Sequence, residues 1–198
     1  MPSTRLYGPS AAPGAAGTLA QNTSGAIAAV LPATQTVLNT AETVIVNPSV
    51  SSSALVVNIP TGSLLEQKPF TLQASGYLNN GTSSTVTIKL YNGTSTTVGS
   101  DTLLGSSGAI TAFSGKAPYY AKAKLIYDSV SGKLQGTVKF MVNNTLVAET
   151  AVSNVVTGIS NVNATGVVTS FVLSVTFGTA GTQVISVNDF AIFDDNGN

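Results

Sequence analysis

The chain has 198 residues, of which 43% are hydrophobic and only 8% are charged, and its formal net charge is zero. An ordinary soluble domain carries about a quarter charged residues, so this surface consists mainly of neutral polar side chains, and a free monomer of this kind tends to associate. The absence of Cys and His removes disulfides, thiolate nucleophiles, the usual general base and the commonest metal ligand.

The first 36 residues differ in composition from the rest of the chain. Ala, Gly, Pro, Ser and Thr dominate, and Arg5 is the only charge before Glu42. Few large apolar groups are present to offset the entropy lost on ordering. We therefore predict an extended arm over residues 1–36 that orders against a partner, and we expect a body without it to keep its melting temperature. Its predicted anchors are the larger side chains Leu6, Tyr7, Leu19, Ile27, Val30 and Leu31.

Neither a membrane nor a nucleic acid is an expected partner. The longest apolar run, from Gly25 to Leu31, ends at Pro32 and is far below the ~20 residues of a spanning helix. The N-terminus lacks the uninterrupted apolar segment of a signal peptide. Eight basic residues are too few to neutralise a long run of phosphates.

From residue 37 onward the apolar residues alternate with polar ones in short runs separated by turn residues. This period of two is typical of antiparallel strands with one buried face, and no helical face longer than two turns can be drawn. The pattern predicts one all-β domain over residues 37–198, an antiparallel jelly roll or β-sandwich. The predicted strands are 43–46, 54–59, 69–77, 85–91, 121–130, 133–142, 145–150, 170–177 and 183–193.

The same alternation predicts the core. Inward positions on these strands carry large aliphatic and aromatic side chains. The side chains expected to be mostly buried are Phe70, Leu72, Val86, Ile88, Leu90, Leu125, Phe140, Val142, Phe171, Leu173, Val175 and Phe190.

Without histidine, an enzyme would need two converging carboxylates, as in a glycosidase. The acids do not favour this, because Asp101 and Asp128 lie beside turn residues, and Glu42, Glu66 and Glu149 are interpreted as exposed charges near strand ends. We therefore predict a non-enzymatic protein without a cofactor.

Calcium is one further alternative for the acids near the C-terminus. Asp189, Asp194 and Asp195 could supply oxygen ligands, but their spacing is not that of an EF-hand loop. A disordered acidic end is favoured.

Charge is segregated along the body. Residues 116–139 hold five lysines against Asp128, whereas residues 140–198 hold four acids and no base. Opposite excesses of this kind favour complementary faces that meet between subunits, and a homotrimer is the expected assembly. The predicted contact residues on the body are Lys116, Tyr119, Tyr120, Lys122 and Lys124.

The order of four short motifs resembles the jelly-roll head proteins of tailed bacteriophages. The motifs are Phe70-Thr71-Leu72-Gln73-Ala74-Ser75-Gly76, Tyr91-Asn92-Gly93-Thr94-Ser95, the stretch from Asp128 to Gly136, and the stretch from Phe171 to Gly178. The resemblance covers about the C-terminal two thirds of the chain. It implies a decoration or cement protein, made in the host cytoplasm, that binds the major capsid protein on the outside of the virion, commonly as a trimer.

A carbohydrate-binding β-sandwich, such as a module of a phage head fibre or tail, is the alternative from another class. Tyr119, Tyr120 or Tyr127 would then offer rings on which a sugar packs. The lack of Trp argues against this alternative, because Trp is a favoured residue for aromatic stacking.

Overall fold

The computed structural model describes most of the predicted body and part of the predicted arm. The described residues are 26–29, 32–37, 40–59, 69–79, 85–93, 95–111, 113, 115–128, 133–155 and 169–194.

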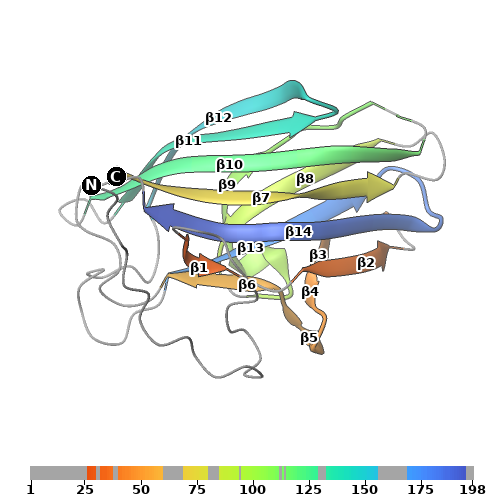
Figure 1. Ribbon diagram of the computed structural model, residues 1–198, viewed down its shortest axis with the longest axis horizontal. Helices are drawn as coiled ribbons and strands as arrows, with labels where there is room; N and C mark the ends of the chain where they lie inside the picture. The colour runs from red at the N-terminus through yellow and green to blue at the C-terminus, as the bar shows by residue number, and fades with distance from the viewer. Residues whose placement is uncertain are drawn as a thin grey trace, which may run out of the picture.

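Two antiparallel sheets pack face to face as a jelly-roll-like β-sandwich (Figure 1). In the seven-stranded sheet, here the large sheet, β14 pairs with β7 on one side and with both N-terminal strands on the other. Its strands in spatial order are β1 (Ala26–Ala29) and β2 (Ala33–Val37), β14 (Gln183–Asp194), β7 (Pro69–Asn79), β10 (Lys116–Asp128), β11 (Lys133–Val142) and β12 (Thr145–Val155).

The five-stranded sheet, here the small sheet, lies behind β14, β7 and β10 in the view of Figure 1. Its strands are β3 (Thr43–Val44) and β6 (Val56–Ile59), both paired with β13 (Thr169–Phe177), then β8 (Val86–Asn92) and β9 (Thr102–Ser106). The short hairpin of β4 (Val46–Asn47) and β5 (Val50–Ala54) and the 3-10 turn η1 (Val98–Ser100) complete the described elements.

The all-β prediction is confirmed, and so is the predicted core. Every side chain expected to be buried has at most 4% of its surface exposed. The core lies between the two sheets, where the rings of Phe70 on β7 and Phe171 on β13 meet with centroids 6.3 Å apart. Alternation therefore identified which face of each strand packs inward.

The N-terminal strands join the predicted arm to the body. β1 and β2 both pair with β14, and the side chains of Ala33 and Val37 are buried. Gln35 accepts a hydrogen bond from the Val46 N–H at 2.9 Å and donates one to the Val44 carbonyl. The predicted boundary between residues 36 and 37 thus falls inside β2. Residues 1–25 lie outside the described residues.

A polar cluster on the outer face of the small sheet is centred on Glu42. Its carboxylate accepts hydrogen bonds from Lys89 Nζ at 2.7 Å, from Tyr91 Oη at 2.8 Å and from Ser174 Oγ at 2.6 Å. The Glu42 side chain is only 19% exposed, so the interpretation of Glu42 as an exposed strand-end charge was wrong. Burial alone would raise the pKa of Glu42, but these hydrogen bonds and the Lys89 charge outweigh it and hold the pKa below its ordinary value.

Replacing this carboxylate tests what the cluster contributes. We expect Glu42→Gln to lower the free energy of unfolding at neutral pH by about 1–3 kcal/mol, because buried donors lose their ionised acceptor. Folding lowers the pKa of Glu42 from 4.5, so this stability is present above about pH 4.5 and is lost as the pH falls through the folded-state pKa. Melting temperatures of the two proteins should therefore converge as the pH is lowered.

The matched control is Glu149→Gln. Glu149 pairs with Lys139 at 3.2 Å, but both side chains are about half exposed, and exposed pairs contribute about 0–1 kcal/mol. A gap between wild type and Glu42→Gln that stayed constant down to acid pH would contradict the linkage.

Among the described residues, no helix is long and apolar enough to cross a membrane.

Candidate functional site

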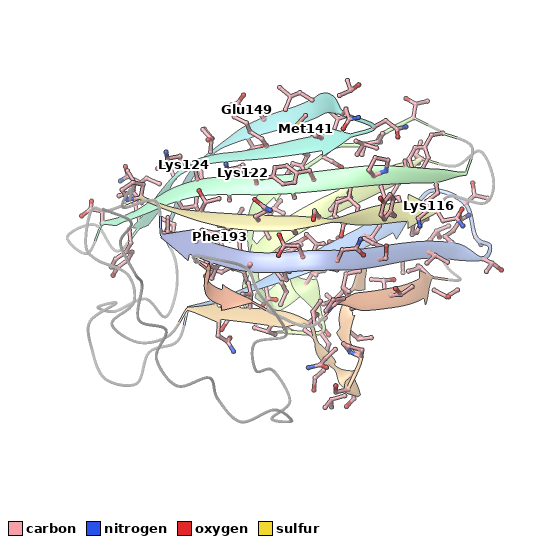
Figure 2. All side chains as sticks on the ribbon, in the orientation of Figure 1. Lys116, Lys122, Lys124, Met141, Glu149 and Phe193 are labelled. Carbon is pink, nitrogen blue, oxygen red and sulfur yellow. The ribbon has the colours of Figure 1, made fainter. Side chains whose placement is uncertain are left out.

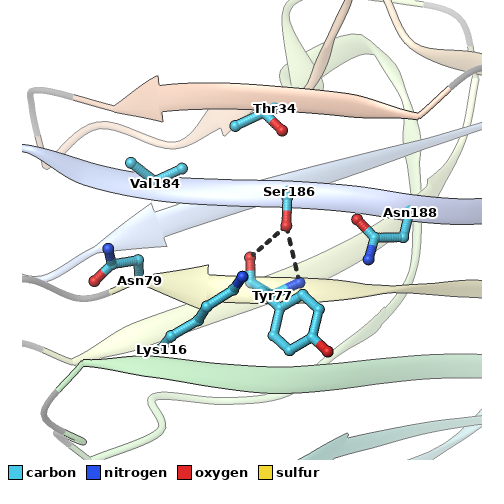
Figure 3. Close-up of a pocket in the computed structure, with 7 residues that line it drawn as sticks. All are labelled: Thr34, Tyr77, Asn79, Lys116, Val184, Ser186 and Asn188. Atoms are coloured by element: carbon cyan, nitrogen blue, oxygen red, sulfur yellow. Dashed lines mark hydrogen bonds between the residues drawn. The ribbon is translucent and has the colours of Figure 1, made fainter.

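An open pocket lies on the outer face of the large sheet, at the end where β7 finishes and β10 begins (Figure 3). Its volume is about 390 Å³, and its lining side chains come from β2, β14, β7 and β10. They are Thr34, Tyr77, Asn79, Lys116, Val184, Ser186 and Asn188.

Strand register accounts for this grouping. Thr34, Ser186 and Tyr77 are directly opposite one another in a row across β2, β14 and β7. In the neighbouring row, Val184 lies opposite Asn79, which lies opposite Lys116. Because residues two positions apart on a strand share a face, the two rows stand side by side and form the floor of the pocket.

Asn188, the last lining residue, shares the outward face of Val184 and Ser186 by strand alternation, and a β-bulge in β14 turns Asp189 to the same face. The register shifts between Val187 and Asp189, so Asn188 and Asp189 both lie on the outward side while Val187 and Phe190 stay buried. Bulges often re-aim side chains beside functional sites. Here the exposed amide of Asn188 borders the pocket.

Tyr77 is the aromatic wall of the pocket. Its side chain is 38% exposed, and the Lys116 ammonium lies over the ring, 4.2 Å from its centroid. A cation in this position is attracted by the ring quadrupole. The pocket therefore combines an open aromatic surface with a positively charged donor beside it.

Ser186 holds the floor in register. Its hydroxyl accepts a hydrogen bond from the Tyr77 N–H at 3.2 Å and donates one to the Tyr77 carbonyl at 3.3 Å (Figure 3). This hydroxyl is engaged with the backbone of β7, and Asn79 and Asn188 add side-chain amides to the lining of the pocket. An amide offers both donors and an acceptor.

A hydrogen-bonded chain of polar side chains continues along the same face. Tyr120 Oη donates to Gln73 Oε1 at 2.6 Å, and Gln73 Nε2 donates to Asp189 Oδ2 at 2.8 Å. Burial, and then the Asp189 charge, raise the pKa of Tyr120. Tyr120 is directly opposite Ser75, one row from Tyr77, so the second outward tyrosine borders the first.

Most of the contact residues predicted from the sequence lie on the outer face of β10 or in the predicted arm. Lys116, Lys122 and Lys124 are exposed on the outer face of β10 (Figure 2), and Tyr120 is partly buried on the same face. Ile27 lies in β1, where only the backbone is described. The remaining anchors of the arm lie outside the described residues: Leu6, Tyr7, Leu19, Val30 and Leu31.

Tyr119 and Tyr127 do not face outward. They are 3% and 2% exposed, and the Tyr119 hydroxyl is buried without a hydrogen-bond partner. Burial raises the pKa of Tyr119. The predictions that Tyr119 contacts a subunit or a sugar and that Tyr127 contacts a sugar are wrong, because strand alternation turns both rings into the core.

The described acids mostly have structural partners. Besides Glu42, Glu149 and Asp189, Asp101 accepts a hydrogen bond from the Ser95 N–H at 3.1 Å. Glu66 and Asp195 lie outside the described residues, as does the Asp194 side chain. No group of three or more Asp or Glu side chains that could hold a metal ion occurs in the described part of the chain.

Sequence reasoning missed most of this pocket, although one signal for it exists. Phe70, Leu72, Ala74 and Leu78 face inward on β7, so Tyr77 stands out as an aromatic side chain on the polar side of that strand. Nothing local to Thr34, Ser186 or Asn188 marks them as its neighbours.

The comparisons with known proteins find similarity only among solved structures. No family model matches the sequence, and no curated protein matches it. The carbohydrate recognition domain of Emp46p is similar in its potassium-bound form with a TM-score of 0.33 and in its metal-free form with 0.35. Each is 8% identical and covers 82% of this chain and 87% of the other.

The carbohydrate recognition domain of Emp47p has a TM-score of 0.34 and 10% identity, over 88% of this chain and 99% of the other. Similarity at this level does not bear on the ligand of this chain.

Proposed function

We propose that this protein is a non-enzymatic, carbohydrate-binding β-sandwich that takes a sugar against Tyr77. The observation that carries the proposal is the outward tyrosine in an open pocket bordered by amides, hydroxyls and one ammonium. Ligand pockets combine apolar or aromatic walls with a few placed polar groups. A sugar has the matching surface, since its C–H faces pack on an aromatic ring while its hydroxyls exchange hydrogen bonds.

The rigidity of the floor also supports this proposal. Tyr77 is in the interior of the large sheet, paired on both sides by β10 and β14. A site built on paired strands loses little conformational freedom when a ligand binds. The ring and the two asparagine amides can thus act together on one small ligand.

A glycan array followed by calorimetric titration of the hits tests the proposal. We expect Tyr77→Ala to weaken binding of a hit about tenfold, since an aromatic contact contributes up to about 1.5 kcal/mol beyond its buried area. The matched control is Leu146→Ala, an exposed residue on β12, which should leave affinity unchanged. An array with no hits at millimolar concentration, or equal affinity of wild type and Tyr77→Ala, would remove the proposal.

Capsid decoration is the second candidate, and the lysines of β10 favour it. Lys122 and Lys124 lie on the outer face, toward the end of the strand away from the pocket (Figure 2), and could meet an acidic lattice protein or a second copy. The two candidates are compatible, because a phage particle can carry a sugar-binding module. Mass spectrometry of purified particles tests capsid decoration independently of the pocket, and sedimentation tests for a homotrimer.

A further inference from the structure

We infer that the sugar bound in this pocket carries a negative charge and that Lys116 recognises it. The inference rests on the proposed function, because it names the chemical class of the ligand for the same site. It commits to a carbohydrate with an anionic substituent, a carboxylate or a sulfate, beside the part that packs on Tyr77.

The charges of the residues that line the pocket favour an anionic ligand. Among the seven described residues that line the pocket, Lys116 alone is charged, and none has an acidic side chain. The acid on the neighbouring row of the same face, Asp189, accepts a hydrogen bond from Gln73 and does not line the pocket. A bound anion would thus meet a cation and neutral donors.

The Lys116 ammonium is also placed to contact a sugar that packs on Tyr77. Lys116 Nζ lies 4.2 Å from the centroid of the Tyr77 ring, while more than a third of the Tyr77 side chain stays open. Because Tyr77 and Lys116 line the same pocket, a sugar that packs on the open part of this ring lies near the ammonium. The ammonium makes a charge-assisted hydrogen bond with a hydroxyl or with an anionic oxygen, but the anionic substituent also gains the attraction between opposite charges.

The wider outer face of the large sheet adds a separate argument. Lys122 and Lys139 lie directly opposite each other on β10 and β11, and Lys124 is exposed two positions further along β10. Glu149 neutralises Lys139 only in part, because that pair is half exposed. On this part of the face Lys116, Lys122, Lys124 and Lys139 outnumber the acids Asp128 and Glu149, and an excess of one charge raises the local concentration of oppositely charged ligands. A polymer of acidic sugars would therefore be attracted along β10, whose first residue lines the pocket.

The experiment compares three ligands of the same backbone: an oligosaccharide that contains uronic acid, its carboxyl-reduced neutral form, and a sulfated form of the neutral one. Calorimetric titration with the full chain at about 50 mM salt keeps electrostatic attraction measurable. We expect wild type to bind one of the two anionic forms at least about tenfold more tightly than the neutral form. Which anion is preferred distinguishes a carboxylate from a sulfate.

Two variants identify which lysine recognises the anionic substituent. Lys116→Gln should abolish the preference for the anion, so that the anionic and neutral forms bind this variant with equal affinity. Lys122→Gln removes a charge from the same face of the same strand outside the pocket and should keep the preference. Equal melting temperatures would show that both variants are folded.

Each outcome separates the inference from the proposed function. If the neutral form binds as tightly as the anionic forms and Tyr77→Ala weakens it, the sugar pocket stands and the inference is wrong. A preference that persists in Lys116→Gln also overturns the inference, because another cation then recognises the anion. If no form binds, both proposals fail together.

Discussion

Replacing Gly76 with alanine is expected to lower the free energy of unfolding by about 3 kcal/mol or more, among the largest effects of any single substitution in this chain. Gly76 lies on β7 between β10 and β14, and a Cβ there would come within 1.8 Å of the Ser186 carbonyl oxygen and 3.1 Å of Tyr119 Cε1. The first atom is backbone and is paired in the sheet, so it cannot turn away. Relief requires β7 and β14 to separate.

The loss should appear in thermal unfolding as a decrease of about 6–12 °C, given about 2–4 °C per kcal/mol for a chain of this size. Gly99→Ala is the control, because nothing lies within 4 Å of a Cβ at Gly99, and we expect a change within about 0.5 kcal/mol. Equal melting temperatures for the two variants would mean that β7 and β14 are not as close as described. Because Tyr77 and Ser186 flank the same contact, Gly76→Ala should also weaken ligand binding.

Removing residues 1–37 is expected to lower the melting temperature by about 10 °C or more. The truncation deletes β1 and β2 and with them the pairing along the free side of β14. It also removes the buried Ala33 and Val37 and leaves the Val46 N–H without its Gln35 acceptor. The exposed edge of β14 should promote association between chains.

A truncation that removes residues 1–24 is the matched control, since it keeps both strands. Differential scanning calorimetry with sedimentation measures stability and association together. If both truncated proteins have the melting temperature of the full chain, β1 and β2 do not stabilise the body. Residues 1–37 then act as the independent arm that the composition predicts.

Strand alternation made most of the sandwich predictable. It located β11 at its observed bounds and the ends of β7 and β14 within two residues, and it identified the buried face of each, but it missed one end of β10 and of β12 by five residues. The same rule could have been applied further on β10, where Tyr119, Leu125 and Tyr127 share one parity and Lys122 and Lys124 the other. The two tyrosines could therefore have been assigned to the core from sequence.

The strands that sequence reasoning missed are short or poor in large apolar residues. β1 and β2 contain mainly Ala and Thr, and β9 has only two large side chains. Such segments have weak intrinsic preference for a strand, and they form here because β14 and β8 present unpaired edges to them. Composition alone therefore indicated an arm where the fold places edge strands.

The sequence by itself determined the fold class, the core and the outward position of Tyr77. Apolar and polar residues alternate along each strand, and this pattern can be recognised from the local sequence alone. Only the tertiary structure decided the pocket, since Thr34, Tyr77 and Ser186 are far apart in the chain and meet through the order and register of β2, β14 and β7. The bulge beside Asn188 and the partly buried pairing of Glu42 with Lys89 were decided in the same way. Register between distant strands depends on all of their contacts at once, and no single segment encodes it.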